Sequence, residues 1–315
     1  MGKETILVTG SNGLLGQKLT DLYLQKEHIQ LIATGKGMNR HPSKEGYVYQ
    51  EMDITDPQNV REVLEKYKPS VLIHTAAMTQ VDDCEFKKEE CDLLNVNAVK
   101  HLAELSSEMT FHLVHLSTDF IFDGTKSMYT ETDEANPLSY YGWSKLEAEK
   151  MVVEHAKSWS ILRTILVYGQ VADMSRSNII LWTYNTLKEQ KSAKVVYDQF
   201  RTPTLAEDLA MGCFLAADQK AQGIFNIAGK DNRAGTSPGG ILRVDALLYT
   251  FGFRRVVWGR QPQPPSPRCP YIAFNNCRAH PCTRPRVVSA EGPVERRQGL
   301  QMDSCDCPLL SFLSS

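Results

Sequence analysis

Tyr141 and Lys145 are four residues apart, so a helix would place both side chains on one face. A tyrosine has a reference pKa of about 10, but an adjacent ammonium favours the phenolate and lowers that pKa. The hydroxyl of Thr118 could hydrogen-bond a substrate oxygen and hold it within reach of the phenol. This trio predicts hydride transfer between a nicotinamide and a carbonyl group. Tyr141 would be the acid, Lys145 would tune it and bind the nicotinamide ribose, and Thr118 would orient the carbonyl.

A Tyr-x-x-x-Lys pair alone is also typical of an amphipathic surface helix, so its interpretation depends on what precedes it. Gly10, Gly13 and Gly16 follow an apolar run at residues 6–8, and apolar residues recur at helical spacing from Leu14. Glycine there permits a tight turn and close approach of a pyrophosphate to a helix N-terminus. The G-x-x-G-x-x-G spacing differs from the usual dinucleotide fingerprint, and a loop with three incidental glycines is the alternative. The strand–turn–helix context favours nucleotide binding.

The second expected strand, residues 28–35, ends without the acidic residue that binds the ribose 2′-hydroxyl of NAD. The following loop offers Lys36 and Arg40, which could bind a 2′-phosphate; two solvated loop cations are the alternative. We therefore predict NADPH as the cofactor, with NADH as the alternative. Asp53 and Ile54, after a third strand, would border the adenine.

Strands and helices alternate along the first half of the chain. Further strands are expected over residues 71–77 and 111–117, and helices are expected from Pro57, capped by Asp56, and over about 94–109. This order predicts an α/β fold with a doubly wound, Rossmann-type parallel sheet that binds ligands at the carboxyl ends of its strands.

Three histidines, His74, His112 and His115, lie in the apolar strands and are interpreted as core residues whose ring nitrogens are satisfied. The formal net charge of −2 argues against a nucleic-acid partner and favours a small-molecule substrate. No apolar run reaches membrane-spanning length and no signal peptide precedes the first strand, so we expect a cytoplasmic protein without membrane contact. A homodimer is left open.

Seven segments carry a family resemblance: residues 9–16, 76–82 with Glu85, 96–98, 117–124, 129–145, 162–164 and 198–204. In these segments the chain resembles the extended short-chain dehydrogenases/reductases and, among them, the dTDP-4-dehydrorhamnose reductase family. The resemblance extends from residue 5 to about 231. It implies NAD(P)H-dependent reduction of the 4-keto group of a dTDP-linked 6-deoxyhexose, which completes dTDP-L-rhamnose.

The resemblance also implies roles for single residues. The catalytic residues would be Thr118, Tyr141 and Lys145. With the two loop cations included, the cofactor residues would be Gly10, Asn12, Gly13, Leu14, Leu15, Gly16, Lys36, Arg40, Asp53, Ile54, Ala76, Ala77, Thr79, Tyr141 and Lys145. The substrate residues would be Val81, Asp82, Thr118, Asp119, Gln199 and Arg201, although Arg201 replaces the small residue expected there. Some family members associate with Mg²⁺, but no carboxylate cluster here requires it, and we predict no metal site.

Two other functions stay open. A non-catalytic NADP(H)-binding subunit, resembling the regulatory subunit of methionine adenosyltransferase, would share the fold and many motifs, and the intact Thr118, Tyr141 and Lys145 favour the enzyme over it. A sugar-nucleotide epimerase or dehydratase would retain NAD between half-reactions. The missing acidic residue after Ala33 argues against that function.

The composition changes after Asp231. No lysine occurs beyond Lys230, arginines are frequent, and five cysteines lie beyond residue 268 without regular spacing. We expect an NAD(P)-binding domain over residues 1–170 and a partial substrate-binding lobe over 171–231, interleaved with it. Residues 232–315 would be an atypical tail, either disordered or translated out of frame, which would leave the substrate lobe small and incomplete.

Overall fold

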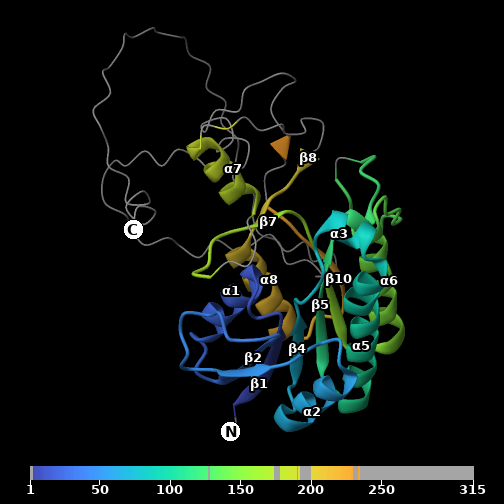
Figure 1. Ribbon diagram of the computed structural model, residues 1–315. Coiled ribbons are helices and arrows are strands. Elements are labelled where there is room, and N and C mark those ends of the chain that lie inside the picture. Colours follow the sequence, from blue (N-terminus) through green and yellow to red (C-terminus); the bar gives the residue numbers. More distant parts are fainter. Residues whose placement is uncertain are drawn as a thin grey trace, which may run out of the picture. The chain divides into compact units, whose positions relative to one another are not determined.

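The computed structural model describes residues 3–126, 128–173, 178–189, 191, 200–229 and 233–234. Its centre is a seven-stranded sheet of order β10-β6-β5-β4-β1-β2-β3, in which every neighbouring pair is parallel (Figure 1). The strands are β1 (Glu4–Thr9), β2 (Ile29–Gly35), β3 (Val48–Glu51), β4 (Val71–His74), β5 (His112–Thr118), β6 (Trp159–Thr164) and β10 (Gly223–Ile227). The strand order reverses between β1 and β4, where such sheets bind ligands. The predicted doubly wound parallel sheet is confirmed.

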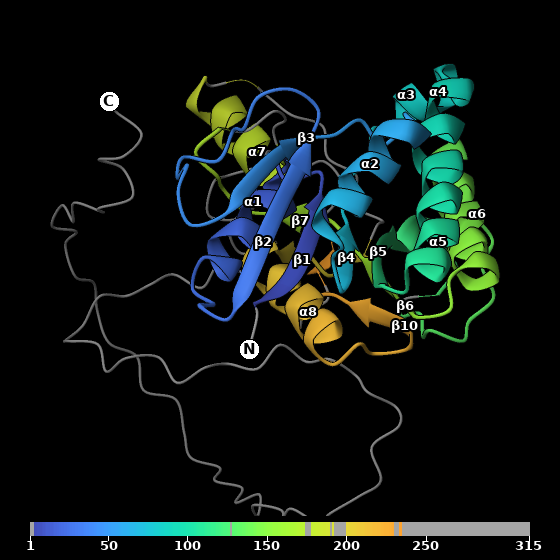
Figure 2. The same ribbon diagram turned by 90° about the horizontal axis from the view of Figure 1, so that it is seen from below.

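Side chains that alternate along the strands divide the core into two layers. Leu7 of β1 faces a layer completed by α2 (Pro57–Tyr67), α5 (Ala98–Met109) and α6 (Tyr140–His155). Its neighbours Ile6 and Val8 face the opposite layer, with α1 (Leu14–Tyr23) and α8 (Ala206–Asp218). Figure 2 shows these helices on the two faces of the sheet. A sheet covered on both faces explains why its strands read as nearly continuous apolar runs.

The helix expected over about 94–109 ends at Met109 as predicted, but it is the last part of an unbroken helical run that begins at Lys88 and contains a π-helical turn. The regular helix α5 starts at Ala98 and is preceded by α3 (Val81–Phe86), α4 (Lys88–Asp92) and a π-helical turn, η1 (Leu93–Asn97). A π turn holds one more residue than an α turn and so re-aims the side chains around it. Asn95, inside this turn, is 1% exposed and points into the protein. Apolar periodicity carries no signal for such an insertion.

The helix start predicted at Pro57 is confirmed. The Asp56 side chain accepts hydrogen bonds from the backbone N–H groups of Gln58 and Asn59, at 3.0 and 3.1 Å. Proline at the first helical position lacks only an N–H that has no partner inside the helix, so it does not weaken α2.

The later part of the chain returns to the central sheet. α8 packs against α1, and β10 extends the sheet beyond β6. The remaining elements are the 3₁₀ helix η2 (Asp119–Ile121), α7 (Ile179–Lys188), the pair β7 (Val167–Tyr168) with β9 (Thr204–Leu205), and the pair β8 (Phe200–Arg201) with β11 (Arg233–Ala234). The domain boundary at residue 170 stays a prediction, and the expected tail, apart from 233–234, lies outside the described residues. None of the described helices has the length and apolar character needed to cross a membrane.

Candidate active site

The glycine-rich turn joins β1 to α1 by very close backbone contacts. Gly10 has φ +67°, and a Cβ there would lie 2.8 Å from the backbone nitrogen of Ala76. A Cβ on Gly16 would lie 2.3 Å from the carbonyl oxygen of Gly10. Gly13 is the N-cap of α1 and supplies no side-chain cap, which leaves the first N–H groups of the helix for an anion. The turn therefore has the geometry of a phosphate cradle.

Asn12 connects this turn to the loop after β2. Its Nδ2 donates to the hydroxyl of Tyr49 and to the carbonyl of Met38, both at 3.0 Å, and its Oδ1 accepts from the backbone N–H of Arg40 at 2.9 Å. The Tyr49 hydroxyl donates to the carbonyl of Gly37 at 2.6 Å. The loop that carries the two predicted phosphate-binding cations is thus fixed against the glycine-rich turn.

Lys36 and Asp53 form an ion pair in which Lys36 Nζ lies 2.7 Å from Asp53 Oδ2. The Lys36 ammonium lowers the pKa of Asp53 to about 2, against the opposing effect of partial burial. The pair brings a residue predicted to bind the 2′-phosphate beside one predicted to border the adenine. The adjacent Ile54 is 8% exposed and packs in the core layer beneath α2, so its side chain is largely occupied there.

The loop after β4 carries Ala76, Ala77 and Thr79, which were predicted to lie on the nicotinamide side. Ala76 and Ala77 are half-buried, and Thr79 is exposed. Asn95 holds this loop: its Oδ1 accepts from the Met78 N–H at 2.8 Å, and its Nδ2 donates to the Met78 carbonyl at 2.9 Å.

The amide of Asn95 also donates to Ser144 Oγ at 3.1 Å. Ser144 lies between Tyr141 and Lys145 on α6, so Asn95 joins the loop after β4 to the predicted catalytic helix. The sequence analysis does not single out this residue. A polar side chain on the buried side of an apolar helix is the signal that could have indicated it.

The predicted catalytic trio comes together at the carboxyl end of β5. Thr118 ends β5, while Tyr141 and Lys145 lie one turn apart on α6, and the three residues are 6%, 8% and 3% exposed. The Thr118 side chain lies close enough to the Tyr141 phenol to affect its pKa. Tyr140 has a different environment, with its hydroxyl donating to Asp92 at 2.8 Å. Of the two adjacent tyrosines, Tyr141 is the buried one, and its phenol lies near Thr118.

The protonation of the trio differs from the sequence-based expectation. Burial raises the pKa of Tyr141 well above its usual range, and the nearby Thr118 hydroxyl opposes this only in part. Burial also lowers the pKa of Lys145 to about 8, whereas the Glu149 carboxylate raises it. The expected lowering of the Tyr141 pKa by Lys145 is therefore not found. In this arrangement the phenol is neutral at neutral pH and can donate a proton.

The three core histidines are buried as predicted, but only His112 has both ring nitrogens hydrogen-bonded, to the hydroxyls of Ser158 and Ser160. His74 and His115 each keep one buried ring nitrogen without a hydrogen-bond partner among the described residues. The prediction that all their nitrogens are satisfied is wrong for these two. The other ring nitrogen of His74 is hydrogen-bonded to Thr9, and the other ring nitrogen of His115 is hydrogen-bonded to Lys145.

The predicted substrate residues differ in their burial and in their contacts with the site. Val81, at the start of α3, packs against the cluster that contains Tyr141, whereas Asp82 is exposed. Asp119 directly follows Thr118 and accepts from its hydroxyl at 3.3 Å. Gln199 and the side chain of Arg201 lie outside the described residues.

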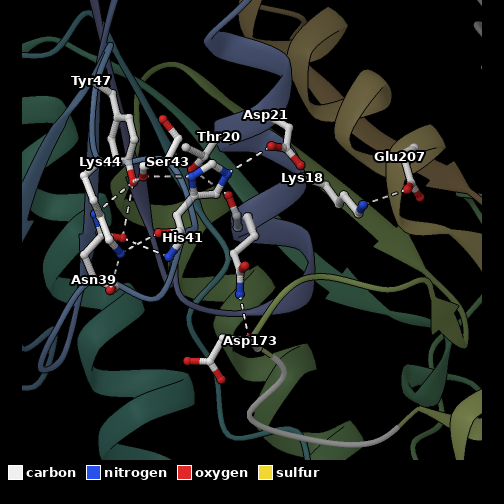
Figure 3. Close-up of polar contacts among 12 residues, drawn as sticks. Lys18, Thr20, Asp21, Asn39, His41, Ser43, Lys44, Tyr47, Asp173 and Glu207 are labelled. Atoms are coloured by element: carbon white, nitrogen blue, oxygen red, sulfur yellow. Dashed lines mark hydrogen bonds and ion pairs between the residues drawn. The ribbon is translucent and has the colours of Figure 1, made fainter. Parts of the chain in front are cut away.

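A pocket of about 310 Å³ lies beside α1, behind the glycine-rich turn, and its lining residues include none of the trio. At its edge His41 bonds Asp21 Oδ1 at 3.0 Å and the Ser43 carbonyl at 3.1 Å, which fastens the loop after β2 to α1 (Figure 3). Nearby, Lys18 of α1 pairs with Glu207 of α8 at 2.9 Å. These contacts join α1 to the loop after β2 and to α8.

The described residues of the glycine-rich turn fit a dinucleotide. The cradle of Gly10 and Gly16 leaves no room for side chains, and the buried hydroxyl of Ser11 in the same turn has no hydrogen-bond partner among the described residues. No group of three His, Cys, Asp or Glu side chains in the described ranges is placed to hold a metal.

Comparison with known proteins identifies the family. The model of the RmlD substrate binding domain matches residues 4–236. A solved dTDP-4-dehydrorhamnose reductase of Clostridium acetobutylicum is 31% identical, covers 73% of this chain and 76% of its own, and superposes with a TM-score of 0.64. The enzyme of the same name from Bacillus anthracis, solved in complex with NADP, is 26% identical, with coverage of 74% and 76% and a TM-score of 0.62.

A different functional class appears among the relatives. Methionine adenosyltransferase 2 subunit beta of Rattus norvegicus is 30% identical over 231 residues, which are 72% of this chain and 67% of that protein. The match over residues 4–236, together with the parallel sheet and the glycine-rich turn, shows that the chain belongs to the RmlD substrate binding domain family.

Proposed function

We propose that this chain is an NADPH-dependent reductase that acts on the 4-keto group of a dTDP-linked 6-deoxyhexose. The observation that carries the proposal is the buried trio of Thr118, Tyr141 and Lys145 beside the phosphate cradle. The solved relatives named dTDP-4-dehydrorhamnose reductase, one of them with NADP bound, support the substrate class and the cofactor.

The cofactor site would use the two parts of the fold that face each other at the carboxyl ends of β1 and β4. The backbone of Gly10, Gly13 and Gly16 would hold the pyrophosphate at the start of α1. Lys36 and Arg40, on the loop fixed by Asn12, would take the 2′-phosphate. A reduced nicotinamide supplies a hydride to a carbonyl carbon when it is bound.

The trio would complete the reduction by handling the proton. The Tyr141 phenol, kept neutral by burial, would donate its proton to the oxygen that becomes an alkoxide as the carbonyl is reduced. The Thr118 hydroxyl would orient that oxygen toward the phenol. The Lys145 ammonium, one helical turn from Tyr141 on α6, would bind the nicotinamide ribose.

The test is oxidation of NADPH by the purified chain with dTDP-4-keto-6-deoxy-L-lyxo-hexose as substrate, with the reduced sugar nucleotide identified by NMR. We expect stoichiometric formation of a 4-hydroxy product. Tight NADPH binding without any product would contradict the reductase. A 4-keto isomer formed without net NADPH consumption would instead indicate an epimerase.

A second candidate is a non-catalytic NADP(H)-binding regulatory subunit, favoured by the 30% identity to methionine adenosyltransferase 2 subunit beta. This function needs the cradle but not proton transfer by Tyr141. It predicts that the chain forms a stable complex with a methionine adenosyltransferase catalytic subunit, measured by light scattering after gel filtration. It also predicts no turnover of the keto sugar.

A further inference from the structure

A row of buried polar residues crosses the sheet behind the predicted site. Thr9 of β1 is the register partner of His74 of β4, and His74 is the partner of His115 of β5. The two imidazoles stack, with centroids 5.5 Å apart and planes 18° apart. Thr9 and His115 are fully buried and His74 is 1% exposed. The row begins one residue before Gly10 and ends at Lys145, so it lies between the cofactor turn and the catalytic helix.

Hydrogen-bond roles fix the proton on His74. Thr9 Oγ1 accepts from the backbone N–H groups of Thr75 and Ala76, at 3.2 and 3.4 Å. The single hydroxyl proton of Thr9 is then directed to Nδ1 of His74, 2.7 Å away. His74 therefore accepts at Nδ1 and carries its own proton on Nε2, in the neutral form that its pKa of about 3, lowered by burial, favours.

The same reasoning fixes the roles of His115 and Lys145. Lys145 Nζ lies 3.1 Å from Nε2 of His115. An ammonium can only donate, so Nε2 of His115 must accept, and its ring proton must be on Nδ1. An imidazolium could not accept this bond. Burial lowers the pKa of His115 well below its usual value, which keeps the ring neutral and able to accept.

The other groups around Lys145 do not replace this acceptor. The carboxylate of Glu149, one turn further along α6, is bonded by Arg163 of β6 at 2.7 Å and by the Ser117 hydroxyl of β5 at 2.5 Å. Its charge acts on Lys145, but no hydrogen bond between the two is recorded. Cys91 of α4 acts on the Lys145 pKa in the same direction as Glu149 but less than it does, and His74 of β4 is neutral.

We propose that His115 is a positioning residue of the proposed reductase site: its neutral Nε2 accepts a hydrogen bond from the Lys145 ammonium, fixes its direction and keeps it protonated. The proposal rests on the proposed function for its catalytic meaning. The hydrogen bond also has a consequence that does not depend on catalysis. Loss of the acceptor must favour the neutral amine and lower the pKa of Lys145.

The test separates the acceptor from the ring. His115→Phe keeps an aromatic ring against His74 but has no acceptor, whereas His115→Gln carries an amide oxygen that can reach the position of Nε2. His115→Asn is a polar counterpart whose shorter amide cannot reach Lys145. The free energy of urea unfolding is measured for each variant from pH 6.5 to 10. The same series is repeated with Lys145→Met, so that the contribution of the amine is isolated as a difference.

We expect the amine's titration step to move to lower pH by about one unit in His115→Phe and His115→Asn, and to stay in place in His115→Gln. Should the Phe variant not fold, the Asn and Gln variants give the same comparison. In the Lys145→Met background, each substitution at residue 115 should change the free energy of unfolding by an amount that does not depend on pH. Equal titration steps in all variants, or a shift in Gln as large as in Asn, would overturn the proposal.

A catalytic readout distinguishes this proposal from the proposed function. If the chain reduces the keto sugar, the alkaline limb of its profile of kcat against pH should shift to lower pH by the same amount in His115→Asn. In His115→Gln the limb should return to its wild-type position. If no variant and no wild-type chain turns over the sugar, the reductase fails, and the unfolding series still decides whether His115 controls Lys145.

Discussion

Lys36 Nζ lies 2.7 Å from Asp53 Oδ2, and this ion pair joins the loop after β2 to the residues that follow β3. The side chain of Lys36 is 80% exposed, so its charge is held in place at the protein surface and not in the core. An anchored but exposed cation suits a phosphate that arrives from solvent. The pair therefore connects two predicted contacts of one cofactor.

Lys36→Ala is expected to weaken NADPH binding by about tenfold and to leave NADH binding nearly unchanged, because a charge-assisted hydrogen bond to a phosphate is lost. The measurement is titration of cofactor fluorescence for both nucleotides. Lys100→Ala, on the exposed face of α5, serves as the matched control. An equal loss for NADPH and NADH would mean that Lys36 does not read the 2′-phosphate.

Gly16→Ala should destabilise the protein without cofactor by about 1–3 kcal/mol, because the added Cβ meets the Gly10 carbonyl at 2.3 Å and the backbone must shift. Gly13→Ala is the control within the same turn, since its Cβ would lie 3.3 Å from that oxygen. Thermal unfolding of both variants checks the difference. Equal melting temperatures would contradict the close packing described here.

Glu149→Gln should cost about 3–5 kcal/mol of unfolding free energy, because it leaves Arg163 buried without its counter-charge. Glu147→Gln removes a carboxylate from the same helix, where it pairs with exposed Lys150, and should change stability by less than about 0.5 kcal/mol. Urea denaturation measures both. A small effect at residue 149 would show that the pair carries little of the site's rigidity.

The buried amine of Lys145 should make stability depend on alkaline pH. Its pKa is about 8 in the folded protein and 10.5 in the unfolded chain, so between these values the unfolded chain binds more protons and the free energy of unfolding rises with pH. Below pH 8 the full cost of burying the ammonium is present. Any stability advantage of Lys145→Met over the wild type should therefore shrink as pH rises from 8 to 10. Lys150→Met, on the exposed side of α6, should give a difference independent of pH.

The sequence predicted the layers of the fold because apolar runs, glycine positions and helix caps are local signals. Asp56 with Pro57 marks a helix start without any knowledge of the tertiary structure, and the spacing of Tyr141 and Lys145 already places them on one face. These features were readable because each depends on neighbours within a few residues.

Contacts between distant elements could not be read in this way. The amide of Asn95, in the π turn, binds Met78, 17 residues earlier, and Ser144, 49 residues later. The bond from Lys145 to His115 likewise depends on how α6 packs on β5. The direction of the Tyr141 pKa shift was mispredicted for the same reason, since burial, which raises it, is a property of the assembled site.

The role of Tyr141 as proton donor in the reduction of a 4-keto sugar nucleotide is tested by the rate of NADPH oxidation by the wild type, Tyr141→Phe and Tyr140→Phe. Tyr140 is the matched control because its hydroxyl binds Asp92 instead of the trio. We predict a fall in kcat of about 10²–10⁴-fold for Tyr141→Phe, with NADPH binding retained, and little change for Tyr140→Phe. Equal rates for Tyr141→Phe and the wild type, or no turnover by any of the three while NADPH binds, would contradict the account.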